Sequence, residues 1–315
     1  MGRVSMQIER KSPLFWGFIL LLAAWLGGLN LGLVQGSWAA EEDSAVGLSE
    51  QGEPESRASD LKPESQPTEQ LSLQINLPAA RLDLYSNGKF QKSYGVAIGM
   101  PKYPTPIRDY NISYIIWNPW WLPPDSEWAQ NAEKTPPGPG NPLGAVKMLM
   151  EDGIRIHGTN APRSIGHASS HACLRMKSDD VRELAWRVQQ AYSDKRDPEL
   201  LDKYTKNRRS TFWVELFQQV PVKVEYLQVE AQPDKVLIHP DRYNRGGFQE
   251  ELQAALASHP EITINKELLA KLKKLRNKGS VEASYQELGE WSRGEAAPAT
   301  PAVGSSPLKK SAAAL

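Results

Sequence analysis

The alternation of apolar and polar residues that begins at Leu71 constrains the fold most strongly. It puts every second side chain on one face, which is the period of a β-strand with one buried side. The alternating apolar residues are Leu73, Ile75, Leu77, Leu82 and Leu84. Asn87-Gly88 is a strong signal for a type I′ hairpin turn, and we expect the return strand over Phe90 to Ile98. The ordered body therefore opens as antiparallel β-structure.

Most later segments continue the β pattern, whereas three others have the apolar period of a helix. Strands are expected over residues 110–116, 145–150, 154–157, 211–229 and 236–238. Helices are expected from Ser178, which we assign as an N-cap, from Phe248, and after Asn265. The sequence predicts a mainly β fold with helices, in the α+β class.

Prolines and tryptophans concentrate on either side of the strand expected over residues 110–116, at Pro104 to Pro106 and from Trp117 to Gly144. Proline is excluded from central strands, so both stretches are expected to form loops. The second contains Trp117, Trp120, Trp121 and Trp128. A linker does not carry this much aromatic surface, so the region either covers the sheet or forms the wall of a binding site.

The N-terminal residues have the features of a targeting segment. Basic residues precede an apolar run from Leu14 to Val34, and Ala39 ends a candidate cleavage site. Residues 1–39 are expected to be a signal peptide or a membrane anchor, and either one exports the rest of the chain. Residues 40–70 and 294–315 are poor in large apolar side chains. They are expected to be a disordered acidic linker and a disordered tail.

The charges of the chain balance, with 37 basic and 37 acidic residues. A global basic field, which would point to nucleic acid, is absent from this composition. We therefore expect no nucleic-acid partner, and membrane contact only through the N-terminal segment.

The stretch from Ile154 to Met176 carries the side chains with reactive chemistry. It holds the only cysteine, Cys173, and three of the five histidines: His157, His167 and His171. A single cysteine in an exported chain is a free thiol, an intermolecular bridge or a buried apolar side chain. The neighbouring histidines favour the free thiol, acting as a nucleophile.

A nucleophilic thiol needs a base, because most of it is protonated at neutral pH. We expect His157, at the end of a strand, to be that general base. The Gly158 carbonyl would orient the other ring nitrogen of the imidazole. Arg175 points the same way as Cys173 if the segment is extended, and would hold a carboxylate or support an oxyanion. His167 has no matching role.

A zinc site is the competing interpretation, because histidine and cysteine are its usual ligands. The stretch lacks the paired CxxC or HxxxH spacing of zinc sites and contains no acidic residue. We expect no metal and no other cofactor.

The stretch closely resembles the L,D-transpeptidase catalytic domain, also called the YkuD domain. The signature of that family is a His-Gly-Thr strand end followed by Ser/Thr-His-Gly-Cys. It is matched by His157-Gly158-Thr159 and by Ser170-His171-Ala172-Cys173, with Ala172 in place of glycine. The resemblance covers about residues 71–229 and includes Asn141-Pro142-Leu143-Gly144.

The resemblance implies an L,D-transpeptidase-like β-sandwich of mixed strands over residues 71–229. The helical periods after Phe248 predict that residues 230–293 are an extension, mainly helical with some β-structure. The resemblance also implies acyl transfer on peptidoglycan stem peptides. Cys173 would attack the third stem residue, D-alanine would leave, and a 3-3 crosslink would form. The acceptor would be a second stem, a lipoprotein or another wall-linked group, in the periplasm or cell envelope.

Further roles and alternatives come with the resemblance. His171 would shape the oxyanion site, and the candidate substrate contacts are Trp120, Trp121, Asn141 and Ser170. One alternative is an L,D-carboxypeptidase or crosslink hydrolase, in which water takes the acyl group. Another is a non-catalytic peptidoglycan-binding protein, which Ala172 would favour.

Overall fold

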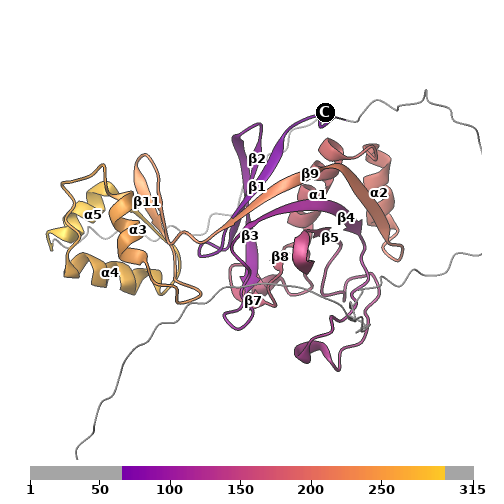
Figure 1. Cartoon of the computed structure of the whole chain (residues 1–315), viewed down its shortest axis with the longest axis horizontal. Helices are drawn as coiled ribbons and strands as arrows, with labels where there is room; N and C mark the ends of the chain where they lie inside the picture. The colour runs from indigo at the N-terminus through magenta and orange to yellow at the C-terminus, as the bar shows by residue number, and fades with distance from the viewer. Residues whose placement is uncertain (1–65, 295–315) are drawn as a thin grey trace, which may run out of the picture. The chain divides into compact units, whose positions relative to one another are not determined.

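The computed structural model describes residues 66–294 (Figure 1). Its main feature is a mixed sheet in the order β2-β1-β9-β4-β5-β6-β8-β3-β7, in which β3 also pairs with β2. The strands are Leu71–Asn76 (β1), Arg81–Ser86 (β2), Lys89–Gly99 (β3), Asp109–Trp117 (β4), Val146–Leu149 (β5), Arg155–His157 (β6), Ala168–Ser170 (β7), Leu174–Met176 (β8) and Phe212–Glu225 (β9).

Strand β3 closes this sheet into a barrel because it is long enough to pair with two neighbours. Its first part pairs with β2, and its residues Val96 and Ala97 pair with β8. Closure removes the exposed edges that an open sheet would leave. The predicted α+β class and mixed strands are confirmed, but the expected two-sheet sandwich is wrong, because one sheet closes on itself.

The alternation that begins at Leu71 fills the barrel core. Its apolar side chains are all buried. The predicted hairpin joins β2 to β3, with positive φ angles at Asn87 (50°) and Gly88 (74°), as a type I′ turn requires.

Two helices follow β8 and pack on the barrel: α1 (Ser178–Tyr192) and α2 (Pro198–Lys206). The buried Trp117 of β4 donates its indole N–H to Gln189 of α1 (2.8 Å) and stacks on Tyr204 of α2, with 5.0 Å between ring centroids. The predicted N-cap is wrong by one residue. Lys177 is the N-cap and makes no side-chain capping bond, and Ser178 is already helical.

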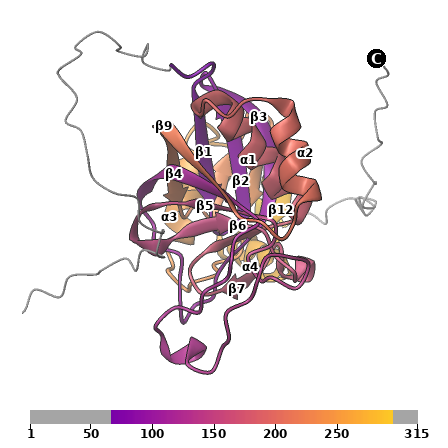
Figure 2. The same cartoon turned by 90° about the vertical axis from the view of Figure 1, so that its right-hand side faces the viewer.

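The long loop between β4 and β5 carries the short helix η1 (Glu127–Ala129) and extends beyond the strands (Figure 2). Trp121 and Thr135 pair across it through two backbone hydrogen bonds of 2.9 Å. The predicted Pro/Trp-rich loop is confirmed for residues 118–145, but Trp117 belongs to β4 and is buried in the core. Two further short helices are η2 (Glu151–Gly153) and η3 (Pro162–Ser164).

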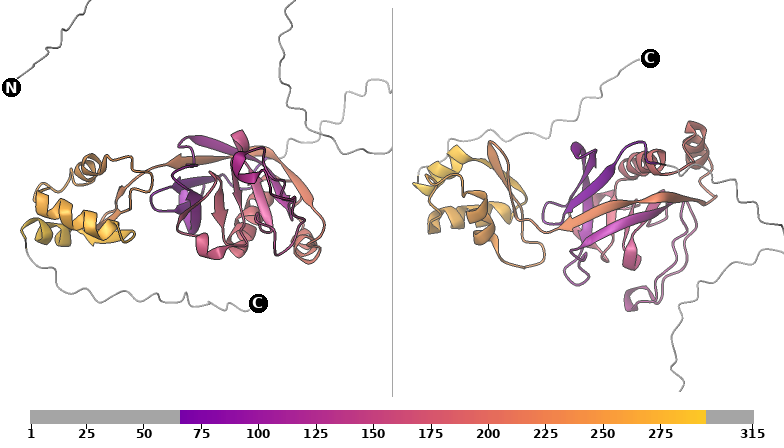
Figure 3. Two further views of the ribbon diagram at one scale, coloured as in Figure 1. Left: turned by 90° about the horizontal axis from the view of Figure 1, so that it is seen from below. Right: turned by 45° about the horizontal axis from the view of Figure 1, so that its top comes forward.

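The C-terminal elements form a second sheet with its own apolar core (Figure 3). The antiparallel strands are β10 (Val229–Ala231), β11 (Lys235–Ile238) and β12 (Val281–Ser284), and the helices are α3 (Phe248–Ala255), α4 (Lys266–Arg276) and α5 (Tyr285–Ser292). Asn265 caps α4 as predicted and accepts the backbone N–H of Leu268 (2.9 Å). The apolar periodicity did not predict β12 or α5, although the capping box of Ser284 and Glu287 is legible in the sequence.

Across residues 66–294, no helix combines the length and apolarity needed to cross a membrane. The predicted signal or anchor (1–39) lies outside the described residues. So do nearly all of the predicted linker (40–70) and tail (294–315).

Candidate active site

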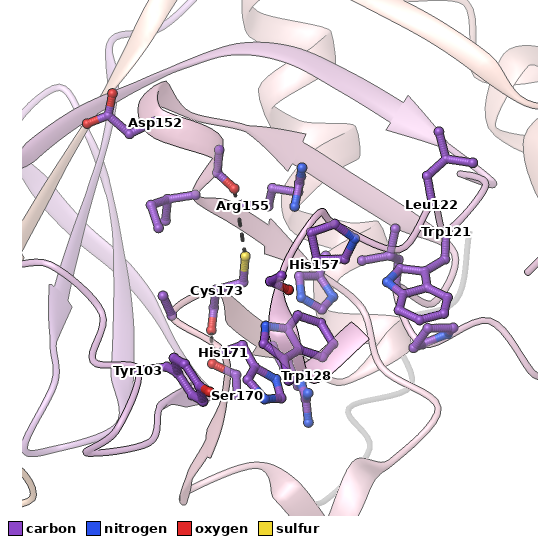
Figure 4. Close-up of a pocket in the computed structure, with 18 of the residues that line it drawn as sticks. Tyr103, Trp121, Leu122, Trp128, Asp152, Arg155, His157, Ser170, His171 and Cys173 are labelled. Atoms are coloured by element: carbon purple, nitrogen blue, oxygen red, sulfur yellow. Dashed lines mark hydrogen bonds between the residues drawn. The ribbon is translucent and has the colours of Figure 1, made fainter. Parts of the chain in front are cut away.

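Strands β6 and β8 bring the two ends of the central stretch together. They are parallel neighbours, with Ile156 paired to Leu174 and His157 paired to Arg175. Cys173 directly precedes β8, two residues before Arg175, so the alternation of the strand directs it to the same face. His157, Cys173 and Arg175 all line one pocket, and Figure 4 shows the first two of them facing it.

His157 is held in a single tautomer by its neighbour. The side chain is 5% exposed, and Nδ1 lies 2.6 Å from the carbonyl oxygen of Gly158. A carbonyl oxygen only accepts hydrogen bonds, so Nδ1 carries the proton in the neutral ring and Nε2 is free to accept one. The backbone of Gly158 packs directly on Gly144, and a Cβ on Gly158 would lie 3.1 Å from the Gly144 Cα. The geometry predicted for Gly158 is therefore present.

His157 is neutral at neutral pH. Burial lowers its pKa to about 3, outweighing the hydrogen bond to Gly158, and the positive charges of Arg175, Arg155 and Lys147 lower it further. Lys147 stands directly opposite His157 on β5. A neutral imidazole with a free Nε2 is the form that accepts a proton from a nucleophile.

Cys173 is a free, partly buried thiol. Its Sγ lies 3.9 Å from the carbonyl oxygen of Gly153, within reach of a weak S–H···O bond (Figure 4). The preceding residue, Ala172, has a φ of 71°. A side chain in this left-handed region costs about 1–2 kcal/mol, so the backbone has the conformation that suits the glycine of the family signature.

His171 lies between two aromatic rings. It stacks on Trp128, with 3.8 Å between centroids and an interplanar angle of 8°, and contacts Tyr103 at 4.9 Å. Burial lowers its pKa, and the charges of Arg175 and Lys102 act in the same direction. The stacking role of Trp128 escaped the sequence prediction, although the Trp-rich composition of its loop was the available signal.

The predicted substrate contacts divide between the pocket and its support. Trp121 and Ser170 line the pocket, whereas Trp120 is 43% exposed and lies outside the lining. The Ser170 hydroxyl donates to the carbonyl oxygen of Cys173. Asn141 also lies outside the lining, and its position does not fit a substrate contact.

Asn141 instead organises the loop between β4 and β5. Its side chain is buried, and its amide nitrogen donates to the carbonyl oxygens of Pro119 (2.9 Å), Thr135 (3.1 Å) and Pro136 (3.0 Å). Its amide oxygen accepts the N–H of Leu143 (2.9 Å). Leu143 lines the pocket, so Asn141 fixes the wall from behind.

The pocket encloses about 650 Å³ and is rich in positive charge. Lys102, Arg155 and Arg175 line it, and none of them forms an ion pair with a carboxylate of residues 66–294. The acidic residue in the lining, Asp152, is paired with Arg108. The excess of unpaired cations suits an anionic ligand.

The N-terminus of α1 is separated from Cys173 by β8, a distance of about 10 Å for three extended residues. The field of a helix end falls off within its first turn, so α1 gives little support to a thiolate at Cys173. Among residues 66–294, no three His, Cys, Asp or Glu side chains are grouped as metal ligands, and His167 is exposed.

A thiol and a neutral imidazole on adjacent strands, with arginines in the same pocket, form a set of groups suited to acyl transfer through cysteine. The model of the L,D-transpeptidase catalytic domain, YkuD, matches residues 71–238. The chain belongs to this family.

Known proteins of this kind match the chain in part. “Putative L,D-transpeptidase YkuD” of Bacillus subtilis (strain 168) is 35% identical over 112 residues, which cover 35% of this chain and 56% of that protein. “Probable L,D-transpeptidase ErfK/SrfK” of Escherichia coli (strain K12) is 36% identical over 73 residues, covering 21% and 24%. The chain thus spans about half the length of the first of these relatives, and less of the second.

Solved structures of the same kind overlap with half of the chain. The NMR structure of the catalytic domain of the E. faecium L,D-transpeptidase has a TM-score of 0.34 and 16% identity, and covers 50% of this chain and 98% of that one. L,D-transpeptidase 3 from Mycobacterium tuberculosis, in complex with a faropenem-derived adduct, has a TM-score of 0.32 and 13% identity, and covers 50% and 60%.

Proposed function

We propose that the protein is a peptidoglycan L,D-transpeptidase with Cys173 as nucleophile and His157 as general base. The observation that carries this proposal is the pairing of β6 with β8. It brings His157, with Nδ1 held by Gly158 and Nε2 free, to the same pocket as the only thiol. Family membership supports the class of reaction, and the pocket residues support the roles.

The first half-reaction forms a thioester. Cys173 Sγ attacks the carbonyl carbon of the third stem residue while its proton passes to His157 Nε2. The tetrahedral oxyanion is stabilised by donors near the turn, among them the neutral ring of His171. The C–N bond to D-alanine then breaks, and His157 returns the proton to the departing amine.

The second half-reaction transfers the acyl group to an amine. The side-chain amine of a second stem attacks the thioester, His157 Nε2 takes its proton, and the C–S bond breaks to release Cys173. Because His157 starts neutral, it can serve as the base in both halves. The crosslink that results joins two third residues, a 3-3 linkage.

The charge of the pocket fits the carboxylates of a stem peptide. Lys102, Arg155 and Arg175 line the cavity without a carboxylate partner among residues 66–294, and arginine binds carboxylates through paired hydrogen bonds. Trp121 and Trp128 add aromatic surface to the lining of the same cavity. We place the reaction outside the cytoplasmic membrane, with the N-terminal segment as the export signal.

The product assay tests this function. The purified full-length protein is incubated with disaccharide-tetrapeptide, and the products are separated by mass. We expect a crosslinked dimer and free D-alanine, both lost in Cys173→Ala. Trimmed monomers without dimer would identify a carboxypeptidase instead, and binding to sacculi without any product would identify a wall-binding protein.

A further inference from the structure

We propose that Tyr243 is a positioning residue for the turn that carries Cys173, so that the segment after β11 supports the reaction in the barrel. The inference rests on the proposed function for its effect on catalysis. Its structural part, the position of the turn, stands independently. Tyr243 lies beyond residues 71–238, the part of the chain that matches the family model.

The backbone of Ala172 is held by hydrogen bonds on both sides. Its N–H donates to the carbonyl oxygen of Tyr103 (3.1 Å), and its carbonyl oxygen accepts the hydroxyl of Thr105 (2.7 Å). Ala172 holds a φ of 71°, a conformation in which a side chain is strained. The residue before the nucleophile therefore depends on its partners in the segment 99–105.

The segment 99–105 forms a tight turn around the Thr105 side chain. Thr105 is 1% exposed, and its hydroxyl also accepts the N–H of Gly99 (3.0 Å). The turn is so tight that a Cβ on Gly99 would collide with the backbone of Tyr103 and Thr105. The position of the Thr105 hydroxyl is thus set by how the two ends of the turn are held together.

The phenol of Tyr243 joins the two ends of this turn, Gly99 and Thr105. Its hydroxyl donates to the carbonyl oxygen of Gly99 (2.9 Å) and accepts the N–H of Thr105 (3.2 Å). One hydroxyl group therefore completes a chain of hydrogen bonds that runs from Tyr243 through Thr105 to the backbone of Ala172, the residue before the nucleophile.

Tyr243 is itself held in place by neighbouring residues. Its N–H donates to the hydroxyl of Tyr226 (2.7 Å), and the two rings stack with 5.5 Å between centroids. The Tyr226 hydroxyl donates to Asp241 (2.6 Å), which also accepts the N–H groups of Arg245 (3.0 Å) and Gly246 (2.8 Å). The phenol is thus presented to the turn by a folded segment between β9 and α3.

The experiment compares Tyr243→Phe with the control Tyr285→Phe in the full-length protein. The Tyr285 hydroxyl donates to Gln232 (2.9 Å) among the C-terminal elements, so the control loses a similar bond elsewhere. Hydrogen exchange of the peptides covering 99–105 and 168–176 is measured by mass spectrometry, together with kcat, KM and Tm. We expect faster exchange of both peptides only in Tyr243→Phe. We also expect kcat to fall about tenfold, the equivalent of about 1.4 kcal/mol, with KM within about twofold.

Rescue distinguishes positioning from a general loss of stability. Glycine adopts positive φ without strain, so Ala172→Gly added to Tyr243→Phe should recover most of the lost kcat. Unchanged exchange in Tyr243→Phe, or equal losses of kcat and Tm in both tyrosine variants, would overturn the proposal. If exchange rises in Tyr243→Phe but no variant, wild type included, turns over stem peptides, the positioning holds and the proposed function fails.

Discussion

At the scale of single residues, the site depends on how the fold treats two side chains. His157 is buried beside cations and given one hydrogen-bond partner, which makes it a neutral base with a defined tautomer. Ala172 is held in a conformation that glycine prefers. Each feature has a measurable consequence.

The buried His157 should make stability depend on pH. Its pKa is about 3 in the folded protein against an ordinary value of 6.5. Between these values the unfolded chain binds a proton at this site that the folded chain lacks, so stability is lost as the pH falls through this window. His157→Asn should flatten the slope of the unfolding free energy there by up to about 1.4 kcal/mol per pH unit. Urea titrations from pH 7 to pH 4 measure it, with the exposed His167→Asn as the control that keeps the slope; an unaltered slope in His157→Asn would contradict the assignment.

The strain at Ala172 predicts a stabilising substitution. Ala172→Gly removes about 1–2 kcal/mol of left-handed strain and adds about 0.5–1 kcal/mol of chain entropy cost, so the folded state should gain up to about 1.5 kcal/mol. The matched control is Ala185→Gly in α1, which should lose about 1 kcal/mol because it lies within a helix. Chemical denaturation of the two variants decides the question, since equal losses in both would show that Ala172 is not strained.

At the scale of elements, the loop between β4 and β5 depends on one amide. Asn141→Ala removes the four hydrogen bonds of this amide and leaves the carbonyl oxygens of Pro119 and Pro136 without their side-chain donor, whereas the Thr135 carbonyl keeps the N–H of Trp121. We expect a loss of about 1–3 kcal/mol of stability and a raised KM, because Leu143 and the aromatic side chains of this loop lose their support. Asn160→Ala, which removes one exposed bond to Gly140, serves as the control in the same denaturation and kinetic measurements. A KM unchanged by Asn141→Ala would mean that the wall is held by other contacts.

The elements also show how far the sequence could predict this protein. Period-two alternation and the Asn87-Gly88 turn predicted the first strands, and the strand expected to end at His157 is found as β6. Barrel closure was missed because it depends on β3 pairing with both β2 and β8, a long-range choice that local periodicity does not record. Asn141 was assigned to substrate because a sequence motif names a residue without saying which way its side chain faces.

At the scale of the whole described chain, a partly buried polar network ties the barrel to the C-terminal elements. Glu230 of β10 accepts hydrogen bonds from Arg81 of β2 (2.7 Å) and Asn76 of β1 (2.6 Å). His239 lies 2.7 Å from the same carboxylate and 2.8 Å from the Ser280 hydroxyl. These contacts, with Tyr243, join the two apolar cores.

This network should make the junction sensitive to acid. Burial alone would raise the pKa of Glu230, but the bonds from His239, Arg81 and Asn76 lower it to about 2 from 4.5. The resulting stabilisation is present above pH 4.5 and is lost as the pH falls through about 2. Glu230→Gln should therefore cost about 3 kcal/mol at pH 7 and flatten the acid slope. Glu282→Gln, in an exposed pair with Lys235, should cost less than about 1 kcal/mol. Thermal and urea unfolding measure both variants, and equal losses of stability in Glu230→Gln and Glu282→Gln would count against the network.

The proposed function is tested most directly by the mass of the Cys173 peptide after brief incubation of the full-length protein with disaccharide-tetrapeptide and rapid acid quenching. We predict a thioester on Cys173 that carries the stem without its terminal D-alanine. This thioester should be absent in His157→Asn. Release of D-alanine by a Cys173→Ala variant, or an acyl group on any other residue, would contradict the proposed function.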